Sequence, residues 1–266
     1  SEHFMKQLSR ICLSPLRIAF DHVGLMKPYE QAVRYASASG LNFLSNYMLY
    51  NFHDTPNDLF QRMRINVSLN EELGTQIYSF PMRYQPTDRP DRGHIGEHWN
   101  KYYLRSIQII LQATHGVVSG APAFFKKAFG NTEDEFLKIL RTPHKYIFNR
   151  DWYEKYNGRS ELDEFNSEFR KLDESEINEL MHFLSSNYPS EYAKESKKML
   201  NKKISKIVPF YELLSEEESR KIWSSQKQIK NKLKIAMADD EIVEDAGLDH
   251  NPDSEIEENM RKVIAR

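Results

Sequence analysis

Residues 44–63 constrain the fold of this chain more than any other stretch, because they predict a strand, a tight turn and a helix in succession. The first half is rich in Tyr, Phe, Met and Leu, which is typical of a buried strand. Thr55 suits the N-cap of the helix that follows, Pro56 its first position, and Asp58 the second member of a capping box. Between strand and helix lies a polar Asn-Phe-His-Asp turn, at a place where α/β proteins bind ligands.

Predicted strands and helices alternate along the first 85 residues. The pattern predicts strands at residues 13–21, 44–52 and 76–84, and helices at residues 28–39 and 56–73. The connections are short enough for parallel crossovers, so we expect a parallel sheet with both helices on one face. No other segment predicts a strand with comparable strength, and the edges of such a sheet would be open. The fold class predicted is therefore α/β.

The rest of the chain is predicted to be helical. A polar loop over residues 85–100 leads to helices at 101–114, 123–129 and 132–140, with a turn at 116–122. Charged amphipathic segments follow, and after residue 238 the sequence becomes acidic, as in a mobile tail. We therefore predict three parts, which are a sheet domain at 1–148, an all-helical extension at 149–238 and an acidic tail at 239–266.

Charge and hydropathy exclude several classes of protein. The formal net charge of −2 argues against a globally basic nucleic-acid-binding protein. No apolar run approaches the roughly 20 residues that span a bilayer, and no signal peptide precedes Ser1, so we expect no membrane association and a cytoplasmic location. The single cysteine, Cys12, excludes an internal disulfide and any site built from several cysteines of this chain.

Several segments occur here in an order shared with a known family. The most distinctive are SNYMLYNFHDTPNDL at residues 45–59 and FPMRY at residues 80–84. LRIAFDH precedes them, and the aromatic segment WNKYYLRSIQIIL and then FFKKAFG follow. Together these segments resemble the carboxyl-terminal half of a radical S-adenosylmethionine (radical SAM) domain, over about residues 15–146.

The resemblance implies both a fold and a chemistry. Radical SAM domains are partial six-stranded parallel β/α barrels, so the three strands here would be the fourth, fifth and sixth, which is half of a partial TIM-type barrel. In the family, three cysteines bind a 4Fe-4S cluster that cleaves S-adenosylmethionine to a 5′-deoxyadenosyl radical. This sequence has no C-x-x-x-C-x-x-C motif, and Cys12 alone cannot bind a cluster.

The chain alone is therefore not expected to be an active enzyme. Three explanations remain open. The cluster-binding amino-terminal half is on another polypeptide, the chain is a fragment that begins at Ser1 without an initiator Met, or the enzyme has decayed into something else.

The resemblance also implies which residues would form the cofactor wall, because the later strands of the family contribute to S-adenosylmethionine binding. The candidates on the strands and at their carboxyl ends are Arg17, Asp21, Asn51, Asp54, Met82 and Arg83. We expect Arg17 and Asp21 to face a concave half-lumen. Structural alternatives are an ion pair between these two residues, a helix-capping role for Asp54 and a core position for Met82.

His94 and His98 form an H-x-x-E-H pattern, the spacing of a zinc peptidase helix. Gly96 lies inside the pattern, and the surrounding sequence is rich in glycine, proline and charge. A surface loop with two solvated histidines is the favoured interpretation, and a metallohydrolase the remote one.

Six lysines over residues 194–206 form a basic run that could contact nucleic-acid phosphates. They are Lys194, Lys197, Lys198, Lys202, Lys203 and Lys206. The favoured interpretation is the solvated face of a helix, which the acidic tail could neutralise.

Aromatic residues are dense enough after the loop to suggest a base-stacking platform. They are Trp99, Tyr102, Tyr103, Phe124, Phe125 and Phe129. Their helical spacing favours packing between helices and the last strand.

The leading hypothesis is part of a radical SAM enzyme that supplies one wall of the S-adenosylmethionine and substrate site, with the substrate unknown. The alternative is a non-enzymatic helical module that binds a protein or nucleic acid. Half of a barrel would expose strand edges and an apolar face. The chain alone should therefore bind an amino-terminal half-barrel polypeptide, associate with itself, or cover that face with its own helices.

Overall fold

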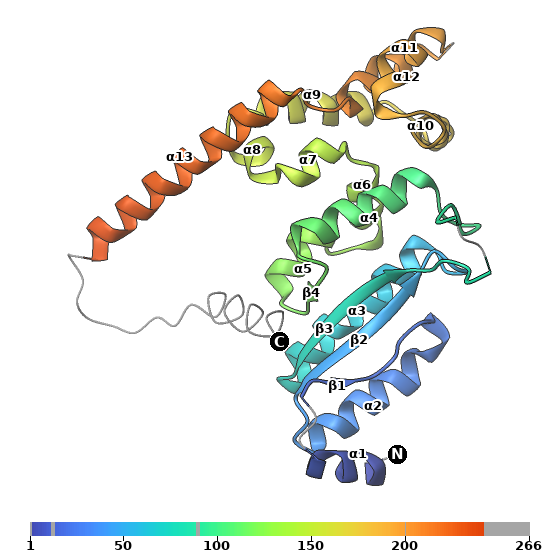
Figure 1. Cartoon of the computed structure of the whole chain (residues 1–266), viewed down its shortest axis with the longest axis vertical. Helices are drawn as coiled ribbons and strands as arrows, with labels where there is room; N and C mark the ends of the chain where they lie inside the picture. The colour runs from blue at the N-terminus through green and yellow to red at the C-terminus, as the bar shows by residue number, and fades with distance from the viewer. Residues whose placement is uncertain (1, 12–13, 89–90, 200, 242–266) are drawn as a thin grey trace. The chain divides into compact units, whose positions relative to one another are not determined.

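The computed structural model describes residues 2–11, 14–88, 91–199 and 201–241, with side chains up to Ile229 (Figure 1). The chain divides into two compact units, Ser1–Leu214 and Ser215–Arg266. The first unit contains a four-stranded sheet in the order β1-β2-β3-β4. The strands are β1 (Leu16–Arg17), β2 (Phe43–Tyr50), β3 (Gln76–Arg83) and β4 (Val118–Ser119).

The five helices predicted at 28–39, 56–73, 101–114, 123–129 and 132–140 are present close to those positions, and the helices at Glu2–Leu8 and His144–Phe148 were not predicted. The helices up to residue 148 are α1 (Glu2–Leu8), α2 (Met26–Ala38), α3 (Pro56–Leu73), α4 (Lys101–Ala113), α5 (Pro122–Phe129), α6 (Glu133–Arg141) and α7 (His144–Phe148). Those of the extension are α8 (Arg150–Lys155), α9 (Arg159–Phe169), α10 (Glu174–Ser186), α11 (Tyr192–Glu195) and α12 (Lys202–Ile207). The second unit begins with α13 (Glu216–Glu241).

The three predicted strands are parallel neighbours, which confirms the α/β class. β1 pairs with β2 from Leu16 opposite Leu44, and β2 pairs with β3 along its whole length. Backbone pairing continues past the end of β1, because the amide of Phe20 donates to the carbonyl of Tyr47 at 3.4 Å. The carboxyl ends of all three strands therefore meet at one edge of the sheet.

The sequence had led us to expect an open outer edge at β3, and this prediction is wrong. β4 pairs with it in the antiparallel direction, with Ser119 opposite Tyr78 and Val118 opposite Ser79. Residues 116–122 were predicted to be only a turn, because a two-residue strand is too short to produce a period-2 pattern. The close approach of β4 requires Gly120, where a β-carbon would lie 2.0 Å from Nδ2 of Asn70.

Local sequence signals define α3 as predicted. The hydroxyl of Thr55 accepts a hydrogen bond from the amide of Asp58, whose carboxylate accepts from the amide of Thr55 at 2.7 Å, forming a capping box. Gly74 ends the helix with φ of 65°, in the left-handed region that glycine adopts at low cost. These bonds fix α3 directly after the turn that follows β2.

A buried polar network joins α2 and α3 to one face of the sheet. The hydroxyl of Tyr29 accepts from Asn46 of β2 at 2.7 Å and donates to Asn66 of α3 at 2.8 Å. Asn66 in turn donates to Ser79 of β3. Because side chains alternate along a strand, these bonds place the even-numbered residues of β2 against the helices.

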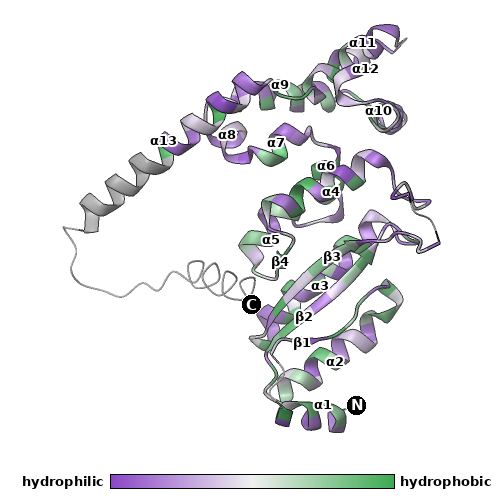
Figure 2. Ribbon diagram, in the orientation of Figure 1, coloured by the Kyte–Doolittle hydropathy of each residue, from purple (hydrophilic) through white to green (hydrophobic). Residues whose placement is uncertain are grey.

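The helices that follow the sheet build a second apolar cluster around α4 and α6, and Figure 2 shows hydrophobic residues where these helices meet. Phe60 of α3 packs against Phe125 and Phe136, with ring centroids 5.7 and 5.5 Å apart. Of the predicted aromatic cluster, Trp99, Tyr102, Tyr103, Phe125 and Phe129 are buried and Phe124 is partly buried. The core interpretation of these rings is therefore confirmed.

The helical extension packs on these helices, with α8 against α7 and α10 against α4. Asp173 and Glu176 begin α10 with the predicted capping box. Of the predicted acidic tail, the backbone of residues 239–241 belongs to α13, and residues 242–266 lie outside the described residues. In the part of the chain that the structure describes, no helix is both long and apolar enough to cross a bilayer.

His144 is the first residue of α7, where it is half-buried against α4. Its ring stacks on Tyr102 with centroids 4.4 Å apart, and its Nε2 is 3.1 Å from the hydroxyl of Ser106. Burial, aided by the nearby charge of Arg105, lowers the pKa of His144 to about 4. The folded protein therefore holds this imidazole neutral at pH values where a solvated histidine would be protonated.

This shift predicts a loss of stability in mild acid. The folded pKa is below the unfolded value of about 6.5, so the unfolded chain binds the proton first, and stability falls as pH drops from 6.5 towards 4. We expect the free energy of unfolding to fall by about 2 kcal/mol between pH 7 and pH 5 through His144 alone. Urea unfolding across this range tests the prediction, and a His144→Gln variant, which cannot titrate, should show a flatter profile. Equal slopes in both proteins would contradict it.

Candidate functional site

The sheet has one face without helices, which we call the bare face. Because side chains alternate along a strand, the residues that alternate with the buried network lie on this face, and they are odd-numbered in β1, in its continuation and in β2 but even-numbered in β3. They are Arg17, Ala19 and Asp21; Phe43, Ser45, Tyr47 and Leu49; and Gln76, Tyr78, Phe80 and Met82.

Aromatic rings cover the middle of the bare face. Tyr47 and Phe80 are direct neighbours on β2 and β3, with ring centroids 5.6 Å apart, and Phe43 meets Tyr78 at 5.5 Å. Tyr47 is 42% exposed and Met82 50% exposed, values that are unusual for apolar residues of a central sheet. The surface is therefore apolar and open to a ligand or a partner.

Arg17 and Asp21 lie on this face, both exposed. The guanidinium of Arg17 lies over the ring of Tyr47, 5.5 Å from its centroid, in a cation–π contact. One carboxylate oxygen of Asp21 accepts a hydrogen bond from the amide of Leu49 at 3.1 Å, which extends the pairing of β1 with β2. Among the described side chains neither residue has an ion-pair partner, so the suggested pair between them does not form.

Asn51, at the carboxyl end of β2, holds the following loop to the sheet. Its amide group donates to the carbonyls of Tyr84 and His94 at 3.2 and 3.1 Å, and its oxygen accepts from the amide of Gly96 at 2.8 Å. The residue is fully buried and has φ of 70°, which asparagine tolerates better than most residues. All of these polar contacts serve the protein itself.

Asp54 forms a buried ion pair with Arg62 of α3, with Nη2 and Oδ2 2.8 Å apart. Arg62 is fully buried and also donates to the carbonyls of Phe20 and Leu49, at 3.2 and 2.8 Å. The second oxygen of Asp54 accepts from the amide of Phe52. One guanidinium thus joins the ends of β1 and β2 to the turn that follows.

Burial shifts the pKa of both members of this pair. Burial raises the pKa of Asp54, although the hydrogen bond from the amide of Phe52 and the charge of Arg62 both act to lower it. Burial lowers the pKa of Arg62, although the charge of Asp54 acts to raise it. Both directions have one cause, which is the cost of burying charge. Arginine still remains protonated in proteins, so the pair is charged at neutral pH.

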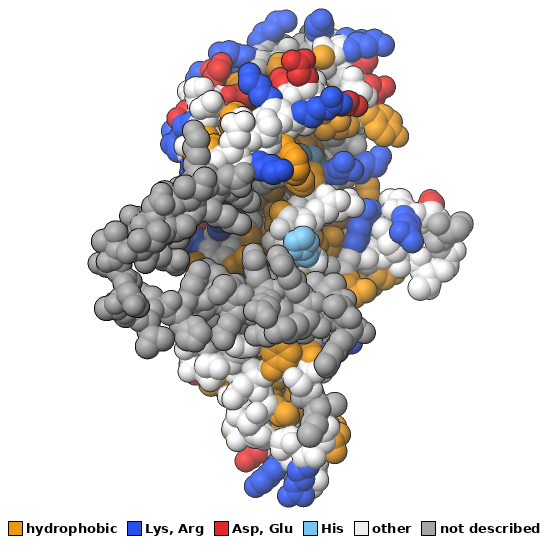
Figure 3. All heavy atoms as spheres, turned by 60° about the vertical axis from the view of Figure 1, so that its left-hand side comes forward, with side chains coloured by type: hydrophobic (Ala, Val, Ile, Leu, Met, Phe, Trp, Pro, Cys, Tyr) orange, Lys and Arg blue, Asp and Glu red, His pale blue; other side chains and the backbone are white. Residues whose placement is uncertain are grey.

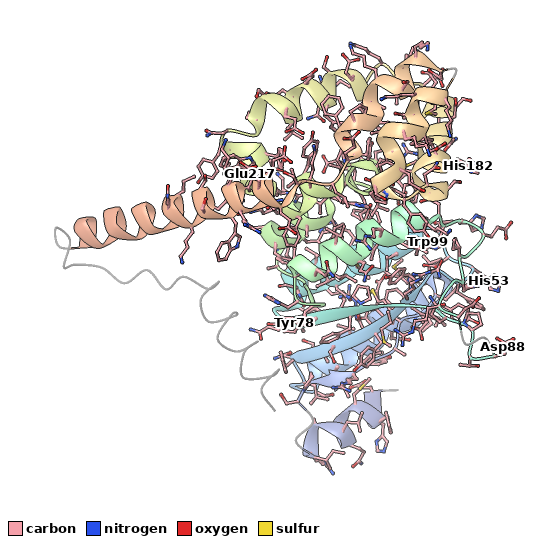
Figure 4. All side chains as sticks on the ribbon, turned by 45° about the horizontal axis from the view of Figure 1, so that its top comes forward. His53, Tyr78, Asp88, Trp99, His182 and Glu217 are labelled. Carbon is pink, nitrogen blue, oxygen red and sulfur yellow. The ribbon has the colours of Figure 1, made fainter. Side chains whose placement is uncertain are left out.

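Met82 and Arg83 end β3, and both are exposed. Arg83 donates to the carbonyl of His94 at 2.8 Å and so helps Asn51 to hold the loop. The indole of Trp99 donates to the carbonyl of Asp54 at 2.8 Å. Figure 4 shows His53 and Trp99 at this end of the sheet, with Tyr78 towards the other end.

The six predicted residues therefore fall into three groups. Arg17, Asp21 and Met82 present side chains on the bare face, whereas Asn51 and Asp54 are buried and bonded within the protein. Arg83 is exposed and bonds the loop after β3. Arg62 was missed, because an arginine in an amphipathic helix usually lies on the wet face. A signal was present, since position 62 falls three residues after Leu59 and four before Asn66, on the stripe of α3 that faces the sheet.

The H-x-x-E-H pattern lies in a loop, as favoured, and not on a helix. Only His98 is exposed as expected, because the ring of His94 is half-buried against Tyr84 and its Nε2 is buried. Its geometry therefore does not place His94 and His98 on one helical face. Within the described residues, no group of three His, Cys, Asp or Glu side chains is arranged to hold a metal ion.

Acidic residues of the extension itself pair with half of the lysine run. Lys198 pairs with Glu195, Lys203 with Glu176, and Lys206 with Glu168. Figure 3 shows basic and acidic side chains interspersed over this part of the molecule. The run is thus a mixed-charge surface, which offers less to phosphates than its sequence suggested.

No protein-family model, no curated protein and no solved structure matches this chain.

Proposed function

We propose that this chain is the carboxyl-terminal half of a radical SAM enzyme, in which the bare face forms one wall of the S-adenosylmethionine and substrate site. The observation that supports this proposal is a mostly parallel sheet whose three parallel strands have α2 and α3 on one face and exposed side chains on the other. In half of a partial TIM-type barrel the face without helices would line the lumen, and the carboxyl ends of the strands would form the mouth of the site.

The groups on the bare face suit a ligand that has a flat ring, hydroxyls and charged ends. Tyr47 and Phe80 offer ring surfaces, and Arg17 and Asp21 offer one charge of each sign. The hydroxyl of Ser45 is buried and has no hydrogen-bond partner, so a polar ligand atom could satisfy it. S-adenosylmethionine combines these features.

The chain does not fit the iron–sulfur cluster. A 4Fe-4S cluster needs cysteine thiolates, and the sequence has one cysteine, which lies outside the described residues. Under this proposal the ligands of the cluster come from residues beyond this sequence or from a second polypeptide. Reductive cleavage of S-adenosylmethionine would then require both halves together.

Saturation-transfer NMR tests the wall without requiring the cluster. With about 10–20 µM chain and about 1 mM S-adenosylmethionine, a half-site of millimolar affinity gives a measurable signal. We expect the adenine protons to receive saturation, and a Tyr47→Ala variant to bind about tenfold more weakly or worse, because it loses a stacking surface.

Tyr188→Ala is the matched control, because Tyr188 is 75% exposed and lies in the helical extension. Its signal should equal that of the unaltered chain. No saturation at all, or an equal loss in both variants, would contradict the proposal. A cysteine-triplet segment in frame upstream or in a neighbouring gene would support it independently.

A further inference from the structure

The bare face is organised symmetrically about its central row. Ala19, Tyr47 and Phe80 lie side by side across the three strands. Arg17 lies two residues before this row and Asp21 two residues after it, so each is about 7 Å from the row along β1. Both are exposed, and neither has an ion-pair partner among the side chains that the structure describes.

This arrangement is complementary to itself. A two-fold axis along the central row, parallel to the face, reverses the strand direction of a second copy. Arg17 of each copy then lies opposite Asp21 of the other, which gives two ion pairs. Tyr47 and Phe80 meet their own equivalents on the axis.

The two rows next to the central one also match under the same axis. Ser45 comes opposite Leu49, and Tyr78 opposite Met82, so small or polar side chains meet larger apolar ones. Two sheets packed face to face commonly cross at about −30°, which a two-fold axis accommodates because each sheet turns by half of that angle.

We infer that two copies of this chain associate through their bare faces into a two-fold dimer. The helices of the extension pack on α4 and α7 and leave Tyr47 and Met82 exposed. A second copy would bury these apolar groups and pair the two isolated charges, which no segment among the described residues does.

The dimer is weak. Three strands about 4.8 Å apart and about 17 Å long make a face much smaller than the about 800 Å² that each partner buries in a standard interface. We therefore expect a dissociation constant in the micromolar range, so that a stronger partner for the bare face can displace the second copy. The inference depends on the geometry of the face and not on the identity of any ligand.

Sedimentation velocity of the full chain at low ionic strength, from about 5 to about 200 µM, tests the dimer. Arg17→Asp and Asp21→Arg should each raise the dissociation constant about tenfold or more, because both pairs become repulsive. An equimolar mixture of the two variants should regain the dimer, since in the mixed pair every acidic side chain again faces a basic one.

Each other outcome overturns the inference. A chain that is monomeric at every concentration has no such dimer, and a dimer that survives either charge reversal uses another surface. Variants that stay monomeric when mixed exclude the two-fold arrangement. If circular dichroism shows that Asp21→Arg does not fold, Tyr47→Glu replaces it, because this change puts two like charges together on the axis and should also abolish the dimer.

These results are separable from the test of S-adenosylmethionine binding. That experiment uses a chain concentration at which monomer is present, so a monomeric chain can still bind the ligand. A chain that gives no saturation signal at a concentration where sedimentation velocity shows it to be monomeric would contradict the proposed function alone.

Discussion

Replacing Arg62 with methionine is expected to lower the free energy of unfolding by about 3–5 kcal/mol, because the change leaves the carboxylate of Asp54 buried without its counter-ion. It also leaves the carbonyls of Phe20 and Leu49 without their donor. Domains of this size are stable by only about 5–15 kcal/mol, so the variant should be close to unfolding. Urea unfolding followed by far-UV circular dichroism measures the loss.

Arg64→Met is the matched control. Arg64 lies on the same helix, is partly exposed, and makes no ion pair among the described side chains. Its replacement should change stability by less than about 0.5 kcal/mol. A similar loss in both variants would mean that arginine in α3 acts through helix propensity and not through the buried pair.

A second change separates the charge from the hydrogen bonds. In the Arg62→Met background, Asp54→Asn removes the unpaired charge and should restore about 1–3 kcal/mol, although it lowers stability when made alone. This opposite sign in the two backgrounds is specific to a coupled pair. Simple addition of the two losses would show that Asp54 and Arg62 act independently.

The sequence predicted those parts of the fold that local signals determine. The capping box of Thr55 and Asp58 and the left-handed Gly74 define α3 with its observed bounds. Residue type and apolar patterning located all three parallel strands, although β1 spans only Leu16–Arg17 of the predicted residues 13–21. Each of these features depends on residues that are close together in the chain.

Features that depend on distant residues could not be predicted in this way. β4 pairs with β3 directly before Gly120, where a β-carbon would collide with the side chain of Asn70 of α3 and crowd the carbonyl of Ile77. Arg62 is buried only because two strand ends and a turn supply acceptors for its guanidinium. Neither relation has a signature in a short window of sequence, although an arginine on the apolar stripe of a helix does point to a buried partner.

In the candidate site, too, features set by neighbouring residues were predicted and features set by distant residues were not. Alternation correctly placed Arg17 and Asp21 on one face of the first strand, because that needs only the strand period. The role of Asn51 was not accessible, since its partners lie more than 30 residues away in the loop. The turn after β2 thus carries two buried anchors, while the groups that a ligand could reach lie along the strands.

Replacing Asn51 with alanine should have the second-largest effect, a loss of about 3–4 kcal/mol. The change removes three hydrogen bonds and leaves the buried amide of Gly96 without an acceptor. It also forces alanine into a backbone with φ of 70°. Asn42→Ala, at the exposed amino end of the same strand region, is the control and should cost less than about 0.5 kcal/mol.

Asn51→Gly separates the two causes, because glycine adopts a positive φ without strain but makes none of the three bonds. We expect it to cost about 2–3 kcal/mol, roughly 1 kcal/mol less than Asn51→Ala. Hydrogen exchange at the amide of Gly96 should accelerate in both variants, since its acceptor is absent from each. Equal losses in the two variants would show that the positive φ costs nothing here. Unchanged exchange at Gly96 would show that other contacts hold the loop to the sheet.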